Sequence, residues 1–561
     1  MALRRFLKRL LVVGLLCATH SPAAHGRLAA AAFTLALSPA LVAEIPGGRI
    51  RTAPHTAPLL HALLDSLEGP TAAEHWQGSH ESLQALQELI RSGRALLLTP
   101  PDADPQLPQG VSSWLASAER TVAALPAGPS YPQLRRAVVA LLVEVWLVAG
   151  ASWSQSYDNA ATRILLKLYD LHAASSVRKS VVEYYHFSKA AGTSVCVTSA
   201  AMGCTTFSVT EQYTCLVPEF VDGPRWMSRK AHNSRCRRTL PGYSQCLTKL
   251  YTKLARWGQR YSPRSALVGC SERAAWLSDR GFNFYASEYT LRGRGGNVSD
   301  APALCSGFLN LAVLRAPQAR LLSHMRYIVR ITYDWLGERT AQYLRNMTLY
   351  DWQRLVPAAF DNYYIRSLLG EAAFYARTGE LNATEHLPAA RAVLGAMDVL
   401  LVLEDSERLL ELGHRWGLGW RKTFLQAEGR ISSRASGEVI QIAERVVPNG
   451  AAAEELAAAN HLDEQLYEYA VRLSRLDAVV WAVAEAAGVV PPATETAAAA
   501  ATATAHVEDD RTGAVGGVVP VPVPAPERGP CGYVAPVWPR PSAPPLPPNA
   551  SGCIPPSPAP H

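Results

Sequence analysis

The junction between an apolar, β-prone run and a helix-like segment constrains the fold of this chain most. The run ends at Lys189, and a turn of small residues leads through Thr193 and Ser194 into the next segment. A strand, a loop and a helix in this order aim backbone N–H groups at a ligand, and the helix N-terminus favours an anion. The common nucleotide-binding loop is excluded, because its lysine follows the glycines and no Gly-Lys pair occurs in this chain.

Two further apolar runs repeat the alternation of strand and helix. They cover 309–314 and 398–405, and helical periodicity fills the spaces between, including 319–345 and 453–487. Alternating strands and helices indicate a parallel sheet covered on both faces, which is an α/β fold. We expect this domain to span 178–487.

The remaining segments differ from this domain in composition. Residues 50–175 have helical periodicity broken by Pro-rich turns, whereas the Ala-, Val- and Pro-rich stretch 488–561 predicts a disordered tail. A basic start, a short apolar run and small residues in 1–26 are typical of a signal peptide. A type II signal anchor that uses the second apolar run, 28–43, remains the alternative. No later segment has the length and apolarity to span a bilayer.

Cysteines and sequons indicate the secretory pathway, either the Golgi lumen or the secreted state. Seven cysteines lie within 196–305, a predicted insertion in the α/β domain, and no C-x-x-C pair indicates zinc. We expect Cys196 to be unpaired and the other six to form disulfides, whose connectivity the sequence leaves open. The N-x-[ST] sequons begin at Asn297, Asn346, Asn382 and Asn549.

The net charge of +7 suits an anionic ligand. It is too small and too diffuse to predict nucleic-acid binding. Basic residues of the insertion are candidates for contacts with an anionic glycan, although a solvated surface loop explains them equally well. They are Arg225, Arg229, Lys230, Arg235, Arg237 and Arg238.

Two segments resemble the Golgi carbohydrate sulfotransferases, which use 3′-phosphoadenosine 5′-phosphosulfate (PAPS). The order Lys-x-Ala-Gly-Thr-Ser is similar to their 5′-phosphosulfate loop. Arg315 and Ser323, eight residues apart with Pro317 and Arg320 between them, are similar to the family's R-D-P-x-x-R-x-x-S element for the 3′-phosphate. Arginine suits that role because its planar fork clamps phosphate. The resemblance implies a P-loop-like sulfotransferase fold and these cofactor-binding residues: Lys189, Ala190, Ala191, Gly192, Thr193, Ser194, Arg315 and Ser323.

The chain departs from the family pattern at three positions. Ser188 replaces the usual proline, Ala190 a threonine and Ala316 an aspartate. These changes leave the expected phosphate donors in place, apart from a hydroxyl at position 190. The resemblance covers roughly 181–422, and within it 360–370 is similar to the family stretch F-x-N-x-x-x-R-x-L-x-G. Arg366 is therefore a candidate cofactor contact, and a structural arginine is the alternative.

The general base is assigned to Glu288. It occupies the position of a histidine that in related uronyl 2-O-type enzymes follows Phe-Tyr-x-x, and it precedes Arg315 by 27 residues. A base must reach the acceptor hydroxyl, and Lys189 would supply positive charge at the departing phosphate oxygen. An exposed loop glutamate is the competing interpretation, with His186 and His232 as other candidates for the base.

The sequence therefore predicts a PAPS-dependent sulfotransferase that needs no metal and acts on a glycan or glycoprotein. We expect contact with a membrane only through a possible anchor in the N-terminal segment. The alternative is a non-catalytic wall or matrix glycoprotein with a degenerate sulfotransferase fold. A kinase or NTPase is disfavoured, because the lysine order is reversed and no acidic metal-binding motif is evident. The acceptor sugar and the oligomeric state are not determined by the sequence.

Overall fold

The computed structural model describes residues 80–97, 107–210, 214–248, 269–292, 302–425, 437–447, 450–489 and 531–535. The signal segment 1–26, the run 28–43 and the sequons at Asn297 and Asn549 lie outside them.

The centre of the molecule is a four-stranded parallel sheet with the strand order β2-β1-β3-β4. Its strands are β1 (Val181–Tyr185), β2 (Phe284–Ser287), β3 (Phe308–Leu314) and β4 (Val399–Val402). Every residue in them is buried, which explains why they are mainly apolar and show no alternation; the polar exceptions are Glu183, Ser287 and Asn310. The expected α/β fold with a parallel sheet is confirmed, and β2 is a strand that the sequence analysis did not predict.

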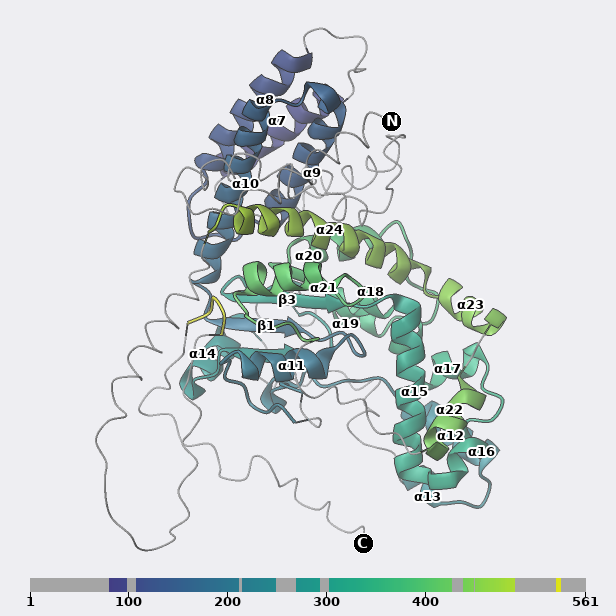
Figure 1. Ribbon diagram of the computed structural model, residues 1–561. Helices are drawn as coiled ribbons and strands as arrows, with labels where there is room; N and C mark the ends of the chain where they lie inside the picture. Colours follow the sequence, from purple (N-terminus) through teal and green to yellow (C-terminus); the bar gives the residue numbers. More distant parts are fainter. Residues whose placement is uncertain are drawn as a thin grey trace, which may run out of the picture.

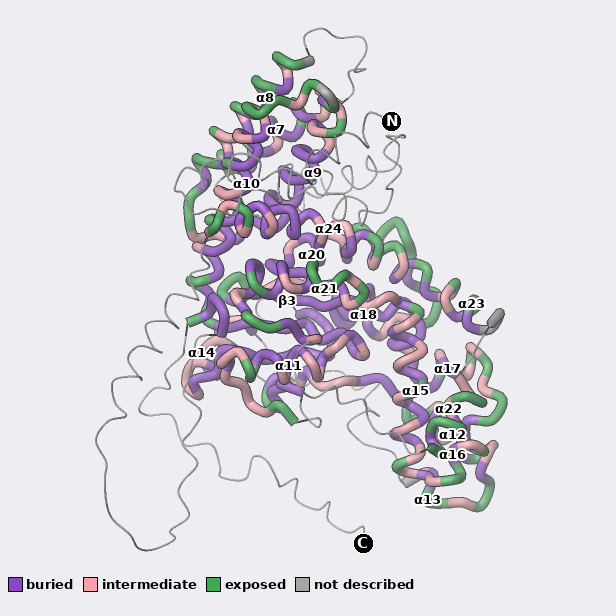
Figure 2. Tube along the Cα trace, in the orientation of Figure 1, coloured by how far each residue is buried: buried purple, intermediate pink, exposed green. Residues whose placement is uncertain are grey.

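Helices cover both faces of this sheet. Figure 1 shows α11 (Gly192–Ala201) on one face, and α20 (His386–Gly395) with α24 (His461–Ala486) on the other. Side chains of Val182 and Tyr184 pack toward α11, whereas Tyr185 belongs to the core shared with α24. In Figure 2 the sheet and the helices against it form the continuous buried centre.

The N-terminal helices extend this core beyond α24. They are α7 (His80–Leu97), α8 (Leu107–Ala123), α9 (Pro132–Ala149) and α10 (Gln155–Ser176). Figure 1 shows α24 lying between them and the sheet, and a single hydrophobic cluster joins all three layers. Buried Arg135 and Arg136 of α9 both bind Asp477 of α24, at 2.8 and 2.7 Å. The predicted helical character of 50–175 is confirmed for its described part.

A smaller helical unit projects from the carboxyl side of the sheet along α15 (Pro317–Leu336). It has its own hydrophobic core, to which α15 contributes Leu321, Met325 and Ile328. The other helices of this unit are α12 (Arg229–Thr239), α13 (Gln245–Thr248), α16 (Thr340–Tyr343), α17 (Leu349–Leu355), α22 (Gly437–Val446) and α23 (Gly450–Ala458). Part of the predicted Cys-rich insertion thus folds against helices that follow β3.

Disulfide formation is confirmed, but two expectations about it are wrong. The pairs are Cys196–Cys215, Cys204–Cys531, Cys236–Cys246 and Cys270–Cys305. Cys196, expected to be unpaired, is bonded, and Cys204 pairs with the tail instead of within the insertion. Four disulfides indicate an oxidising compartment such as the secretory pathway. None of the helices in the described part of the chain combines the length and apolarity needed to cross a membrane.

The prediction of a disordered tail is also wrong for 531–535. Cys531 is anchored by its disulfide, and the buried Tyr533 donates a hydrogen bond to the Trp416 carbonyl at 3.0 Å. The Tyr533 hydroxyl also lies 3.0 Å from that of Tyr169 in α10. This short segment therefore links the N-terminal helices to the sheet domain.

Candidate functional site

The candidate site lies at the carboxyl edge of the sheet, between β1 and β3. From β1 the chain proceeds to β2 on one side and then crosses to β3 on the other. Connections that leave neighbouring parallel strands in opposite directions create a crevice, which is where ligands bind in open α/β sheets. The loop that carries Lys189 follows β1, and Arg315 follows β3 directly. The topology thus brings the two sequence-predicted elements to one crevice.

The loop after β1 has an unusual backbone. Lys189 and Ala191 have left-handed φ values of 70° and 63°. For residues other than glycine this conformation costs about 1–2 kcal/mol each. Tyr184 of β1 stabilises the loop, because its hydroxyl donates a hydrogen bond to the Ala190 carbonyl at 3.1 Å. A Cβ on Gly192 would lie only 1.6 Å from Nε2 of His186, so the loop requires glycine there.

Helix α11 begins at Gly192 and presents the N–H groups of its first turn. No side chain caps this helix, whose N-cap residue is Ala191. The first N–H groups of a helix have no partner within it, and together with the helix dipole they favour an anion. Thr193 and Ser194 are half-buried in this turn. The loop and the helix start therefore have the geometry of an anion cradle.

Arg315 is tied to the loop and to the neighbouring helix. Its Nη1 donates to the Lys189 carbonyl at 3.3 Å, and its own carbonyl accepts from the Tyr364 hydroxyl at 2.6 Å. Its Nε lies 3.8 Å from a carboxylate oxygen of Glu404, and its side chain is 29% exposed. The N–H of Ala316, which replaces the family aspartate, donates to Glu404 at 3.0 Å. Glu404 is thus a partner for Arg315 that the sequence analysis missed.

Positive groups gather where α15 meets the loop. Ser323 is half-buried on this helix, between the buried side chains of Arg320 and His324. The Lys189 ammonium lies 4.3 Å from the ring centre of Tyr327, one turn beyond Ser323. Burial, with Arg320 and Lys189 nearby, holds the pKa of His324 well below its usual range, so this histidine is neutral. Neither of its ring nitrogens has a hydrogen-bond partner among the described residues.

Glu288 lies at the same edge, just beyond the end of β2. Ser188, which replaces the family proline, donates from Oγ to Glu288 Oε1 at 2.7 Å and lies 2.8 Å from the Tyr363 hydroxyl. The Glu288 backbone N–H donates to the Asp222 carbonyl at 3.0 Å. Glu288 is 8% exposed, which excludes the exposed loop glutamate considered above. The sequence did not reveal that Glu288 is buried, because its partner Ser188 lies 100 positions away in the chain.

Burial raises the pKa of Glu288 to about 7, although Ser188 and Lys189 act in the opposite direction. The positive charge of Lys189 therefore does not offset the effect of burial on the pKa of Glu288. His186 lies with Nδ1 3.7 Å from Glu288 Oε2. Burial and then Lys189 lower the pKa of His186 to about 3, so it is neutral and forms no charged pair with Glu288. A carboxyl group that titrates near neutral pH is suited to accept a proton.

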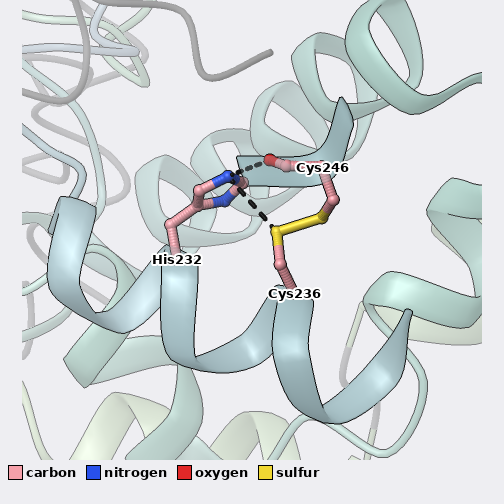
Figure 3. Close-up of side chains that lie close together, drawn as sticks. All are labelled: His232, Cys236 and Cys246. Carbon is pink, nitrogen blue, oxygen red and sulfur yellow. Dashed lines mark hydrogen bonds between the residues drawn. A yellow bond between two sulfur atoms is a disulfide. The ribbon is translucent and has the colours of Figure 1, made fainter. Parts of the chain in front are cut away.

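His232 has a structural role in the smaller helical unit (Figure 3). Its Nε2 lies 2.8 Å from the Cys246 carbonyl and its Nδ1 2.8 Å from the Tyr343 hydroxyl. Among the described residues, only His232, Cys236 and Cys246 group closely enough to suggest a metal site. Both sulfurs are used in the Cys236–Cys246 disulfide, so this trio does not offer thiolate ligands.

Arg366 also has a structural environment. It is fully buried, and its guanidinium pairs with Asp361 and donates to the carbonyls of Ala373 and Ala376, at 3.0 and 2.7 Å. These contacts favour the structural alternative over a cofactor contact. Of the six basic residues in the insertion, Arg225 and Arg235 are buried, whereas these are exposed: Arg229, Lys230, Arg237 and Arg238.

Comparison with known proteins gives no match: neither a family model, nor a curated protein, nor a solved structure is similar to this chain.

Proposed function

We propose that this protein is a sulfotransferase that transfers a sulfuryl group from PAPS to a hydroxyl of a glycan or glycoprotein in the secretory pathway. The observation that carries the proposal is that the Lys189 loop, the uncapped start of α11 and Arg315 converge at the carboxyl edge of the sheet between β1 and β3. A P-loop-like sulfotransferase fold is part of this proposal and is consistent with the four parallel strands.

The donor groups in the crevice suit a ligand with two separate anionic ends. The N–H groups of Gly192, Thr193 and Ser194 with Lys189 form one donor set, which would hold the 5′-phosphosulfate. Arg315 and Ser323 form the second, which would hold the 3′-phosphate. Because Arg315 reaches the Lys189 carbonyl, the two sets are adjacent. Glu404 lies near Arg315, so a bound phosphate would have to compete with this carboxylate for the guanidinium.

PAPS, when bound, supplies an activated sulfuryl group. Lys189 would stabilise negative charge that develops on the phosphate side of the bond that breaks. Glu288 would accept the proton of the acceptor hydroxyl, because its pKa of about 7 leaves a substantial ionised fraction at neutral pH. The Ser188 hydroxyl orients this carboxylate toward the loop that carries Lys189. The acceptor hydroxyl would therefore have to reach a carboxylate that is 8% exposed.

A non-catalytic secreted wall or matrix glycoprotein is the second candidate. The burial of Glu288 and the proximity of Glu404 to Arg315 favour it, since both reduce access to the proposed machinery. The two candidates differ in nucleotide binding. A protein with a degenerate site would bind neither PAPS nor its product.

Calorimetric titration of 3′-phosphoadenosine 5′-phosphate into the full-length secreted chain tests the proposal. The full chain is needed because Cys531 is bonded to Cys204. We expect micromolar binding, weakened by at least ~1.5 kcal/mol in both Lys189→Ala and Arg315→Ala, the scale of a charge-assisted contact. Arg178→Ala is the matched control, because this exposed arginine precedes β1 at the opposite edge of the sheet.

Binding that disappears in both variants and persists in the control would support the proposal and justify glycan screening with labelled PAPS. Absence of binding to a demonstrably folded chain would overturn it in favour of the matrix glycoprotein. Magnesium-dependent binding of ATP instead would indicate a kinase or NTPase.

A further inference from the structure

We propose that Asn346 and Asn382 carry N-linked oligosaccharides. Each begins an N-x-Thr sequon with no proline at the middle position, Asn346-Met347-Thr348 and Asn382-Ala383-Thr384. The four disulfides indicate an oxidising compartment, where the lipid-diphosphate-linked oligosaccharide donor of the secretory pathway is available. This inference does not depend on the proposed sulfotransferase activity.

Modification forms a bond between the asparagine Nδ2 and C1 of the first sugar. The bond from C1 to the diphosphate of the lipid carrier breaks, and Nδ2 loses one proton. A modified asparagine keeps its side-chain carbonyl and one N–H. The folded protein can therefore hold such a glycan only where Nδ2 faces solvent and the carbonyl provides the structural bonds.

Asn382 meets this requirement. It is exposed, in a turn before α20. Its Oδ1 accepts from the Glu385 N–H at 2.8 Å and from the Thr384 hydroxyl at 3.1 Å. Its Nδ2 makes one long contact, 3.4 Å to the Glu385 carboxylate. The turn is thus stabilised by the atom that glycosylation leaves unchanged.

Asn346 lies in the exposed turn between α16 and α17. Its φ of 53° is left-handed, a conformation that asparagine tolerates better than most residues. Thr348 is the N-cap of α17 and accepts from the Asp351 N–H at 3.2 Å. Asn346 and Thr348 therefore have structural roles as well as a place in the sequon. The test of modification needs substitutions that remove the sequon without removing the structural role, and the reverse.

A glycan at Asn346 would stand beside α12. Arg235 of this helix donates to the Arg345 carbonyl at 2.7 Å, and Arg238 donates to Asp351 at 2.9 Å. The oligosaccharide would then cover part of the basic surface of α12. This position disfavours α12 as the binding surface for a long polyanionic acceptor.

The test is the mass of the full-length chain secreted from a eukaryotic host, before and after amidase release of N-glycans. We expect Asn346→Gln and Asn382→Gln each to remove one glycan. Thr348→Ser and Thr384→Ser should retain the glycans, since serine preserves the sequon and the N-cap hydroxyl. Thr348→Ala and Thr384→Ala should lose them.

A measurement on the unmodified sequence covers the case in which a variant fails to fold. Amidase release in ¹⁸O-labelled water converts a glycosylated asparagine to labelled aspartate, which peptide mass spectrometry locates. Label at both positions supports the proposal. Unlabelled, unmodified Asn346 and Asn382 in the secreted protein would overturn it.

Discussion

The Nη1 atom of Arg315 donates a hydrogen bond to the carbonyl oxygen of Lys189 at 3.3 Å, and this bond joins the loops that follow β1 and β3. The two residues are 126 positions apart in the chain. Their proximity follows from the strand order, because β3 pairs directly with β1. Both loops therefore open toward one crevice, and a change in either one should affect the other.

Gly192→Ala should disrupt the loop, since the added Cβ would lie 1.6 Å from Nε2 of buried His186. We expect the free energy of unfolding to fall by about 1–3 kcal/mol, as in other overpacked sites. Affinity for 3′-phosphoadenosine 5′-phosphate should fall at least tenfold, a change of about 1.4 kcal/mol. Urea unfolding and calorimetry measure the two effects.

Gly223→Ala is the matched control, because nothing lies within 4 Å of a Cβ built there. The contact with His186 is tested by the double variant His186→Ala/Gly192→Ala. If the contact is the cause, the double variant should be less destabilised than the sum of the single variants. Additive losses would show that another contact limits position 192.

Glu288→Gln should make the stability of the protein less dependent on pH. The pKa of Glu288 is raised from its ordinary value of 4.5 to about 7 by burial. The folded state therefore binds this proton more tightly than the unfolded state. The resulting stabilisation is complete below about pH 4.5 and is lost as the pH rises through 7, at a cost of up to about 3 kcal/mol.

The measurement is the difference in unfolding free energy between the original chain and Glu288→Gln from pH 5 to pH 8. A difference is required because burial also raises the pKa of Asp463 to about 7. Glutamine can still accept from Ser188, so the local bond is retained. Parallel pH profiles for the two proteins would show that Glu288 does not titrate in this range. If Glu288 is the base, kcat should also fall by about 10²–10⁴-fold.

Removing the Cys204–Cys531 disulfide should destabilise the protein by about 2–5 kcal/mol, the usual range for a native disulfide. The bond spans 327 residues and holds Tyr533 against Trp416. We expect Cys531→Ser, Cys204→Ser and the double variant to lose the same amount in urea unfolding. An unchanged midpoint for Cys531→Ser, with a free thiol detected at Cys204 in the original chain, would contradict the pairing.

Asp477→Ala should destabilise the junction between α9 and α24 by about 3–5 kcal/mol, because it leaves Arg135 and Arg136 buried without their carboxylate. Glu485→Ala removes a carboxylate from the same helix, where it pairs with the exposed Arg408. That control should cost less than about 1 kcal/mol. Equal losses in the two variants would mean that burial does not determine the strength of these pairs.

The sequence by itself determined the local elements. Mainly apolar runs predicted β1, β3 and β4, because strands buried on both faces need no alternation. The small-residue turn before Thr193 predicted the strand, loop and helix that form the anion cradle. These features depend on side chains within a few residues of one another, so they are visible in the linear chain. Their use for PAPS stays a prediction.

Only the tertiary structure decided which distant residues meet. The short strand β2 is stabilised by pairing with β1, and its four residues carry too weak a pattern to reveal it. The same holds for the bond from Ser188 to Glu288 and for the disulfide from Cys204 to Cys531. The raised pKa of Glu288 is likewise a consequence of burial. Such contacts depend on how strands and helices pack in three dimensions, which residue spacing along the chain does not specify.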